Sequence, residues 1–390
     1  MRASVLVSSL VASLVGFGGT LALVLAAARA VGASEPEASS TVAALCLGVA
    51  ATSLLLSLRY RIPIVTAWST PGAAVIATFG GGIGMPKAVG AFLLAGLLVL
   101  ACAAIRPLAR LVSRIPMCVA SAMLAGVLVR FVMGLAENAV AAPLIVLPML
   151  ALFFLVRLYS PTAAVLAVLV AGAGAIFATG AAGLDALVFQ PPHLAFMVPQ
   201  ADVSVLLGLG VPLFLVTMAA QNLPGLAVLR AMGYQPPTSP LLAATGAATV
   251  LLAPFGSTGI NLAAITAAIT ANPDAHPDPA RRYLAGVSYG VWYILLAVLG
   301  ASLVGVFAAL PPAFIATVAG LALIAPLTGA LAGALQEEQD RLAAVVTFAT
   351  TASGVAVLGM GAPFWGLLAG LVVFALERLR VRFATKRPHG

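Results

Sequence analysis

Charged residues are scarce in this sequence: Asp, Glu, Lys and Arg make up 8% of its 390 residues, against about 25% in soluble domains. This scarcity excludes an ordinary soluble domain. The rest of the composition agrees, since 62% of the residues are hydrophobic and the mean hydropathy is +1.15. Apolar runs of membrane length recur along the chain. A helix needs about 20 such residues to cross a hydrocarbon core of about 30 Å. The runs do not alternate as barrel strands do, so we predict an all-α polytopic membrane protein.

Cysteine and histidine are also scarce, with three of each. The cysteines are Cys46, Cys102 and Cys118, and the histidines are His193, His276 and His389. No CxxC spacing occurs, and each histidine lies in a polar connection or in the tail. We therefore expect packing cysteines, no metal site and no cofactor. An intramembrane enzyme lacks support too, because no HExxH motif and no pair of mid-span aspartates occurs.

The 19 Lys and Arg residues give a net charge of +8. They lie in short connections between apolar runs, as topology signals do, so we exclude a nucleic-acid partner. Sixteen fall on one side of the predicted membrane: Arg2, Arg59, Arg61, Arg106, Arg110, Arg114, Arg157, Arg230, Arg281, Arg282, Arg341, Arg378, Arg380, Arg382, Lys386 and Arg387. Arg29 and Lys87 fall on the other side, and Arg130 lies inside a predicted span. The asymmetry predicts an even number of spans and cytoplasmic N- and C-termini.

Pro, Gly and charged residues divide the chain into fourteen apolar segments. In the first half these are residues 5–28, 41–58, 63–80, 86–106, 116–134, 139–156 and 161–180. In the second half they are residues 202–222, 239–253, 254–271, 282–306, 311–332, 341–359 and 363–379. The first segment is long enough for a retained helix rather than a signal peptide. We predict about 14 transmembrane segments.

Two pairs of motifs relate the halves of the chain. PIVTAWSTPGAAVIA from Pro63 resembles PFGSTGINLAAITAA from Pro254, 191 residues later. IPMCVASAMLAGVL resembles LPPAFIATVAGLAL with a spacing of 194 residues. We therefore predict two seven-span repeats, residues 1–200 and 201–390. Because seven is odd, the second repeat must be inverted in the membrane, as in many secondary transporters.

The third segment, IPIVTAWSTPGAAVIATFG, is broken at its centre by Ser69, Thr70, Pro71 and Gly72. Ser and Thr cap helix N-termini, and proline suits a first helical turn. We predict an extended chain followed by a half-helix from about Thr70, with its positive end near the bilayer midplane. The tenth segment has a similar break at Gly256, Ser257, Thr258, Gly259 and Asn261.

Two such half-helices, related by an inverted repeat, would point their N-termini at one another across the midplane. That arrangement binds an anion without a buried lysine. The alternative, that both breaks only kink packed helices, stays open at this point.

Five further candidate residues lie near the breaks or inside apolar runs. Gln221 and Asn222 end an apolar run, where two amides can donate to a carboxylate or cap the helix. Trp68 can stack on an aromatic ligand or pack in the core. Arg130 can snorkel to the surface, pair with Glu137 or act as a substrate counter-ion. No acidic residue lies in mid-span, so a proton would travel on a substrate carboxylate or through Glu137.

The motifs YRIPIVTAWSTPGAA, PLFLVTMAAQNLPG, SPLL…APFG and AHPD, in this order, closely resemble the BenE-type benzoate transporter family of bacteria over nearly the whole chain. The resemblance implies a benzoate/proton symporter of the inner membrane. Its fold would be that of nucleobase–cation symporters and sulfate-transporter-type anion exchangers. A core domain would comprise about residues 1–110 and 201–308, and a gate domain about 111–185 and 309–384. A homodimer through the gate domain is implied by the resemblance alone.

In that fold the substrate lies between the broken third and tenth spans, beside the eighth span. The expected substrate-binding residues are Trp68, Ser69, Thr70, Pro71, Gly72, Gln221, Asn222, Ser257, Thr258 and Asn261. Nucleobase symporters of this fold carry a glutamate on the eighth span, where this chain has Gln221, which argues against a nucleobase.

We expect a transporter that imports a small aromatic carboxylate, benzoate first, by proton symport and an elevator-type mechanism. An exchanger of sulfate-like anions, a nucleobase carrier and a passive channel are the alternatives.

Overall fold

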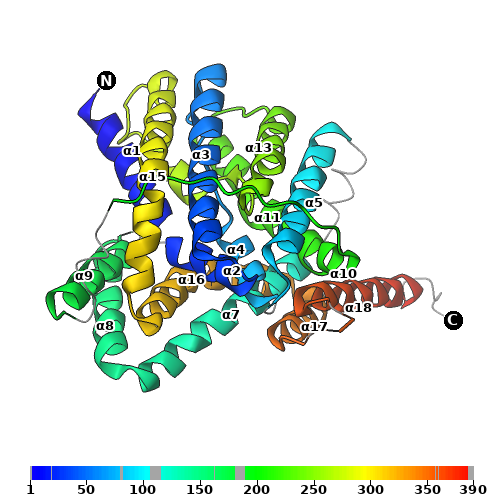
Figure 1. The fold of residues 1–390 in the computed structure, drawn as a ribbon. Coiled ribbons are helices and arrows are strands. Elements are labelled where there is room, and N and C mark those ends of the chain that lie inside the picture. The colour runs from blue at the N-terminus through cyan, green and yellow to red at the C-terminus, as the bar shows by residue number, and fades with distance from the viewer. Residues whose placement is uncertain are drawn as a thin grey trace.

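Backbone groups cannot stay unpaired in lipid, so apolar segments fold as helices, and the computed structural model of this chain is mainly helical (Figure 1). It describes residues 2–18, 20–79, 82–105, 116–161, 163–180, 189–355, 357–358 and 360–384. Within these residues, nine helical stretches are long and apolar enough to cross a membrane, when adjoining helical elements are counted as one stretch. The predicted domain boundaries near residues 110 and 185 lie outside the described residues, as do Arg106, Arg110, Arg114, Lys386, Arg387 and His389.

The elements of the first half follow the predicted segments. They are α1 (Ala3–Gly18), α2 (Leu21–Ala30), α3 (Glu35–Tyr60), β1 (Thr66–Ala67), α4 (Thr70–Thr78), α5 (Met85–Ala104), α7 (Met117–Ala141), α8 (Pro143–Tyr159) and α9 (Ala164–Ala178). The first segment is therefore two helices, α1 and α2. The third segment is a short strand followed by a half-helix, as its break predicts.

The second half begins with a run of short helices and continues with longer ones. Its elements are α10 (Val203–Val205), η2 (Leu206–Gly210), α11 (Val211–Thr217), η3 (Met218–Asn222), α12 (Leu223–Ala231), α13 (Thr238–Leu252), η4 (Ala253–Phe255), β2 (Asn261–Leu262), α14 (Ile265–Thr270), η5 (Pro279–Arg281), α15 (Tyr283–Ala309), α16 (Pro312–Leu335), η6 (Glu338–Asp340), α17 (Arg341–Ala352) and α18 (Ala362–Ala384). The helices α4, α8, α9, α14 and α17 are too short to cross about 30 Å alone. The fourteen-span count stays a prediction.

The predicted end of the eighth segment is wrong. The eighth segment does not end at Asn222 but continues as helix to Ala231. The sequence suggested an end because Pro224 cannot donate a hydrogen bond inside a helix. Instead, η3 is a wide π-helical turn, in which the Leu223 N–H bonds to the Met218 carbonyl. A second π-turn, η2, precedes Pro212 in the same way. Each wide turn lets the helix pass a proline.

The helices pack in two groups. The strand-pair bundle contains α1–α5 and α10–α15, in which α3 packs along α15 and α5 along α13. The outer bundle contains α7–α9 and α16–α18, in which α7 packs against both α16 and α17. In Figure 1 the outer bundle occupies the lower part of the molecule, with α8 and α9 on one side and α17 and α18 on the other. Contacts between the bundles are fewer and include those of α2 with α16, of α4 with α7 and of α1 with α9.

An extended strap, residues 189–202, crosses the strand-pair bundle and appears as the green trace in front of α15 and α3 in Figure 1. Its backbone bonds to Ser302, Ser40, Pro254 and Pro86 in turn. At its end, Lys87 Nζ lies 2.8 Å from Asp202, and this contact holds the pKa of the Asp202 carboxyl below its usual value. The strap therefore connects α15, α3, η4 and α5.

Small residues allow the helices to approach closely, as expected in membranes. A Cβ on Gly246 of α13 would lie 2.9 Å from the backbone nitrogen of Leu100 in α5. A Cβ on Gly174 of α9 would meet nothing within 4 Å. These two helical glycines therefore allow a comparison between a closely packed position and an open one.

We expect Gly246→Val to lower the thermal unfolding midpoint in detergent, because overpacking of this kind costs about 1–3 kcal/mol. Gly174→Val, with the same residue change, should unfold near the wild-type temperature. Equal shifts in the two variants would contradict the close packing of α5 on α13.

Candidate substrate site between the two bundles

The two breaks meet at the centre of the strand-pair bundle. β1 and β2 pair antiparallel, with Thr66 opposite Leu262 and Ala67 opposite Asn261. Each strand is followed three residues later by a half-helix, α4 after β1 and α14 after β2. The tenth segment therefore contains a strand and a helix of six residues. Its non-helical part continues past Gly259 through the strand at Asn261 and Leu262.

Side chains from neighbouring helices satisfy the backbone of both strands. Ser53 Oγ accepts a hydrogen bond from the Thr66 N–H at 3.0 Å, and Thr249 Oγ1 accepts one from the Ile260 N–H at 2.9 Å. Asn222 Oδ1 accepts one from the Leu262 N–H, also at 2.9 Å. All of these groups are buried, where an unpaired N–H costs about 1–3 kcal/mol. Ser53, Thr249 and Asn222 therefore stabilise the extended backbone at the two breaks.

At the breaks, the spacing in the structure differs from the spacing of the aligned sequence motifs. The half-helices begin at Thr70 and Ile265, 195 residues apart, whereas the sequence motifs were aligned with a spacing of 191. The spacing of 195 places Ile265, rather than Asn261, in the position of Thr70. Ser257 and Thr258 therefore lie before the second strand and are not the counterparts of the α4 cap.

The first half-helix begins as its sequence predicts. Ser69 is the N-cap of α4, and its hydroxyl accepts a hydrogen bond from the Gly72 N–H at 2.9 Å. Pro71 lies in the first turn, where its missing N–H costs nothing. Gly72 lets α4 approach α11, since a Cβ there would lie 2.8 Å from Leu213 Cδ1. On α14, by contrast, the N-cap Ala264 has no side-chain hydrogen bond to offer.

A cavity of about 410 Å³ lies between the two bundles, at the N-terminal ends of both half-helices. Its volume falls in the lower part of the range for small-molecule pockets, about 300–1,000 Å³. The wall from the strand-pair bundle consists of Thr70, Pro71, Val216, Ala219, Ala220, Gln221, Pro224, Ala264 and Ile265. The wall from the outer bundle consists of Met117, Ala120, Ser121, Leu124, Ala325, Pro326, Gly329 and Ala330.

The polar groups of this cavity are few. Thr70 and Gln221 lie in the first wall and Ser121 in the second, and the lining residues include no charged side chain. Gln221 belongs to the π-turn η3, and π-turns often occur at functional sites. Gln221 is partly exposed while its neighbour Asn222 is fully buried. The two adjacent amides therefore serve different purposes.

Asn222 lies in the interior rather than at the cavity. Because its Oδ1 accepts from Leu262, its Nδ2 is the donor toward Asn261 Oδ1, at 3.4 Å. Asn222 thus links η3 to β2. Since it lies inside a continuous helix, it does not cap a helix end.

Three predicted residues of the second break also lie outside the large cavity. Thr258 and Asn261 line a separate cavity of about 10 Å³, together with Thr217 and Thr249. That volume fits about one water molecule and is too small for a substrate. Ser257 is fully buried, and its hydroxyl has no partner among the described residues.

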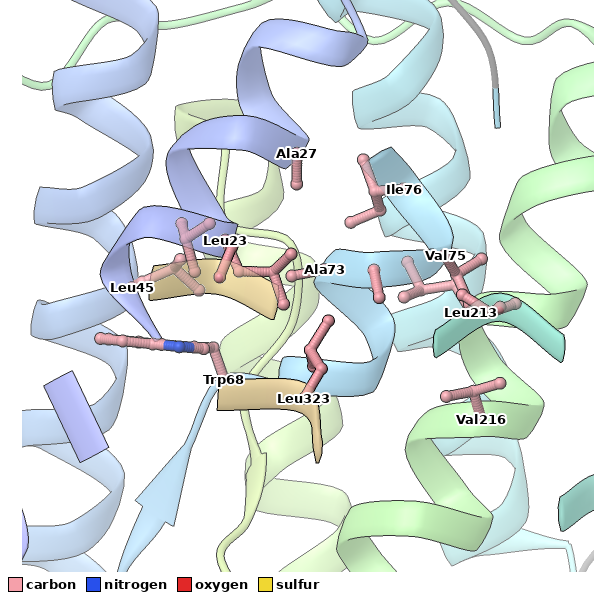
Figure 2. Packing of buried hydrophobic residues seen from close by; sticks show 14 of the residues in the cluster. Leu23, Ala27, Leu45, Trp68, Ala73, Val75, Ile76, Leu213, Val216 and Leu323 are labelled. Atoms are coloured by element: carbon pink, nitrogen blue, oxygen red, sulfur yellow. The ribbon is translucent and has the colours of Figure 1, made fainter. Parts of the chain in front are cut away.

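Trp68 is not among the residues that line the cavity. Figure 2 shows its indole extending away from Leu213 and Val216, of which Val216 lines the cavity. Its Nε1 donates to Thr20 Oγ1 at 2.8 Å. The ring packs edge-on against Phe17 and Tyr293, with centroid distances of 5.8 and 6.0 Å. Trp68 is 3% exposed, so in this conformation it packs in the core.

Arg130 and Glu137 lie on α7, exposed and outside the cavity lining. The Arg130 guanidinium lies against Gly354, just after α17. Neither residue is in position to contact a ligand bound in the large cavity.

In the part of the chain that the structure describes, neither a metal-ligand cluster nor a hydrolase nucleophile motif in its usual setting occurs. Among the described residues, no group of three or more His, Cys, Asp or Glu comes together. The segment GVSYG (286–290) has the spacing GxSxG of serine hydrolases, which requires a strand-to-helix turn. Here it lies inside α15, and the Ser288 hydroxyl is buried and bonded to Ser9 Oγ at 2.8 Å.

Sequence reasoning missed the second wall of the cavity. The motifs of α7 and α16 were noted only as repeated segments, because Ala, Gly and Ser in an apolar helix do not reveal which face borders a cavity. It also missed Ser53 and Thr249. A signal for these was present, since Ser53 and Ser57, and Thr245 and Thr249, lie four residues apart on one helix face.

Comparisons with known proteins agree with this architecture. Residues 1–376 match the family model BenE, described as benzoate membrane transport protein. The chain is 38% identical over 374 residues to inner membrane protein YdcO of Escherichia coli, covering 96% of each chain. It is 34% identical over 371 residues to the benzoate membrane transport protein of Acinetobacter baylyi, covering 95% of this chain and 94% of that one.

Solved structures share the fold at low sequence identity. The transmembrane domain of a cyanobacterium bicarbonate transporter, BicA, matches with a TM-score of 0.59 and 15% identity, covering 95% of this chain and 97% of that chain. SLC26A9 matches with a TM-score of 0.61 and 12% identity, covering 95% of this chain and 65% of that chain. At such identities the likeness shows the fold alone.

We expect Asn222→Ala to lower the thermal unfolding midpoint, because it leaves the Leu262 N–H unpaired in an apolar interior at a cost of about 1–3 kcal/mol. Gln221→Ala, one residue away and at the cavity, should unfold close to the wild type. The measurement is thermal unfolding of both variants in the same detergent. A larger shift for Gln221→Ala would contradict the roles assigned to the two amides.

Proposed function

Since the chain belongs to the BenE family of benzoate membrane transport proteins, we propose that it transports a small aromatic carboxylate, benzoate first, across the membrane. The observation that carries the proposal is the cavity between the bundles. One of its walls presents Thr70 and Gln221, and the other is almost entirely apolar. A molecule with a carboxylate at one end and an unsubstituted ring at the other has the matching polar and apolar sides.

The carboxylate would lie at the polar wall. Gln221 can donate two hydrogen bonds and Thr70 one, and the positive end of the α4 dipole favours a negative charge there. Hydrogen bonds to a charged group contribute about 1.5–3 kcal/mol each. The ring would pack against Leu124, Pro326 and Gly329 of the outer bundle.

The same lining favours an aromatic acid over the alternatives. A hydrated inorganic anion such as sulfate would lose water to apolar side chains without a lysine or arginine in the lining to compensate. A nucleobase has several polar edges, and the cavity offers few polar partners beyond Gln221, Thr70 and Ser121.

We include proton symport in the proposal. The lining has no ionisable side chain, so the simplest proton carrier is the carboxyl group of the substrate, whose pKa near 4 leaves it mostly ionised at neutral pH. Glu137, on the outer bundle, is the other candidate. Arg130 would act at a distance, since neither residue borders the cavity.

The proposed mechanism is an elevator in two inverted seven-span repeats. The register of the strand pair supports the inversion. In the pair Thr66–Leu262, the residue 195 positions after Thr66 is Asn261, and the residue 195 positions before Leu262 is Ala67. These two residues form the other pair of the ladder, as a two-fold relation between the repeats requires. The packing of α3 on α15 and α5 on α13 has the same symmetry. The strand-pair bundle would be the moving core, and the outer bundle the gate.

The proposed location is the bacterial inner membrane, with both termini in the cytoplasm. The relative YdcO carries the name inner membrane protein, which supports this location. The uneven distribution of Lys and Arg between the two predicted sides of the membrane supports the orientation. A homodimer through the outer bundle belongs to the same proposal. Exposed apolar residues on α8, such as Leu144 and Leu158, would then face lipid or a second copy.

Uptake of labelled benzoate into proteoliposomes tests the function. With an inward proton gradient we expect protein-dependent accumulation that collapses when an ionophore is added. Protein-free vesicles subtract permeation of the neutral acid. Equilibration without accumulation would indicate a passive channel, and absence of uptake would contradict a benzoate transporter.

Substitutions at the polar wall test the site. We expect Gln221→Ala and Thr70→Val to weaken benzoate binding about tenfold or more, from the loss of one hydrogen bond to a charged group. Thr78→Val, on the same half-helix but outside the cavity, and Gln336→Ala, at the end of α16, are matched controls. The readout is binding to purified protein. Wild-type affinity in both test variants would exclude this wall as the carboxylate site.

A further inference from the structure

Three glycines of α16 face different surroundings. A Cβ on Gly320 would lie 2.9 Å from the Phe131 carbonyl, and a Cβ on Gly333 would lie 2.9 Å from Ser121 Oγ. Both glycines therefore let α16 pack on α7. A Cβ on Gly329 would meet nothing within 4 Å, although Gly329 lies only one turn from Gly333.

Gly329 is open because it borders the cavity. It lines the same 410 Å³ space as Gln221 and Thr70, and it is exposed. Between Pro326 and Ala330 the cavity wall is therefore formed by Gly329, which contributes no side chain. Glycine inside a helix is less stable than alanine by about 0.5–1 kcal/mol, and no neighbouring helix requires it at this position.

We propose that Gly329 is a specificity-determining residue, whose missing side chain provides the space into which ring substituents of an aromatic carboxylate fit. This inference rests on the proposed function, since it assumes that the ring lies against the outer bundle. A side chain at this position would project into the ligand space rather than into another helix. It would therefore restrict the ligands without disturbing the packing of α16 on α7.

Ligand binding should weaken progressively as the side chain at position 329 becomes larger. Alanine adds one methyl group to the wall, so it should reduce binding of a ring substituent that occupies the same space and spare the unsubstituted ring. Leucine fills more of the cavity and should reduce binding of the unsubstituted ring as well. A change of one methylene in an apolar pocket alters affinity by about 10–200-fold.

The test is competition for labelled benzoate by benzoate and by 2-, 3- and 4-methylbenzoate on purified full-length protein. For Gly329→Ala we expect benzoate to bind near wild-type strength and at least one methylbenzoate to bind about tenfold more weakly. For Gly329→Leu we expect all four acids to weaken by about tenfold or more. Gly174→Ala and Gly174→Leu, at a helical glycine that also has open surroundings, should leave every affinity unchanged.

The outcomes separate the inference from the proposed function. If the wild type binds none of the acids, the proposed function fails. If it binds benzoate but no methylbenzoate, or if Gly329→Leu binds like the wild type, the inference alone is overturned. Equal losses in the Gly174 and Gly329 variants would also overturn it, because the effect would not be local.

A second measurement avoids any change in the ligand. In a background in which Cys46, Cys102 and Cys118 are alanine, Gly329→Cys should react with a maleimide, and saturating benzoate should slow the reaction about tenfold. Gly174→Cys should react at the same rate with and without benzoate. A Gly329→Cys rate that does not change with benzoate would contradict contact between this position and the ligand.

Discussion

The structure depends on the pairing of backbone groups where two helices are interrupted inside an apolar protein. An extended chain within a membrane survives only where other protein groups take over its hydrogen bonds. β1 and β2 supply part of these bonds to each other. Ser53, Thr249 and Asn222, from three different helices, supply bonds that the strands cannot make. The ends of α4 and α14 at the cavity follow from this arrangement.

The cavity is divided between two bundles that differ in polarity. The wall from the strand-pair bundle contains Gln221 and Thr70, positioned by a π-turn and by a capped helix start. The wall from the outer bundle contains small and apolar residues of α7 and α16. Because each wall belongs to a separately packed group of helices, relative movement of the groups would change the cavity without disrupting the strand pair. An elevator mechanism needs this separation.

Individual residues show how far the sequence could be interpreted. The start of α4 was predictable, because Ser69, Thr70 and Pro71 combine a cap with a proline at the first turn, and both signals act locally. The continuation of the eighth segment past Pro224 was not, since a π-turn depends on neighbours that stabilise an unusual helix. Trp68 illustrates the same limit. Its position in a broken segment suggested a ligand, whereas its neighbours Phe17, Tyr293 and Thr20 come from distant parts of the chain.

The sequence alone determined the membrane class, the apolar segments, the two breaks and the family resemblance, because hydrophobic runs, proline and cap residues act through local chemistry and through the solvent. Only the tertiary structure decided which polar residues border the cavity and which support the backbone. Gln221 and Asn222 are adjacent amides with the same chemistry, and only the direction of each side chain in the folded protein separates them. The tertiary structure likewise decided that Gly329 opens onto the cavity while Gly333 packs on α7. A glycine carries no side chain from which its surroundings could be inferred.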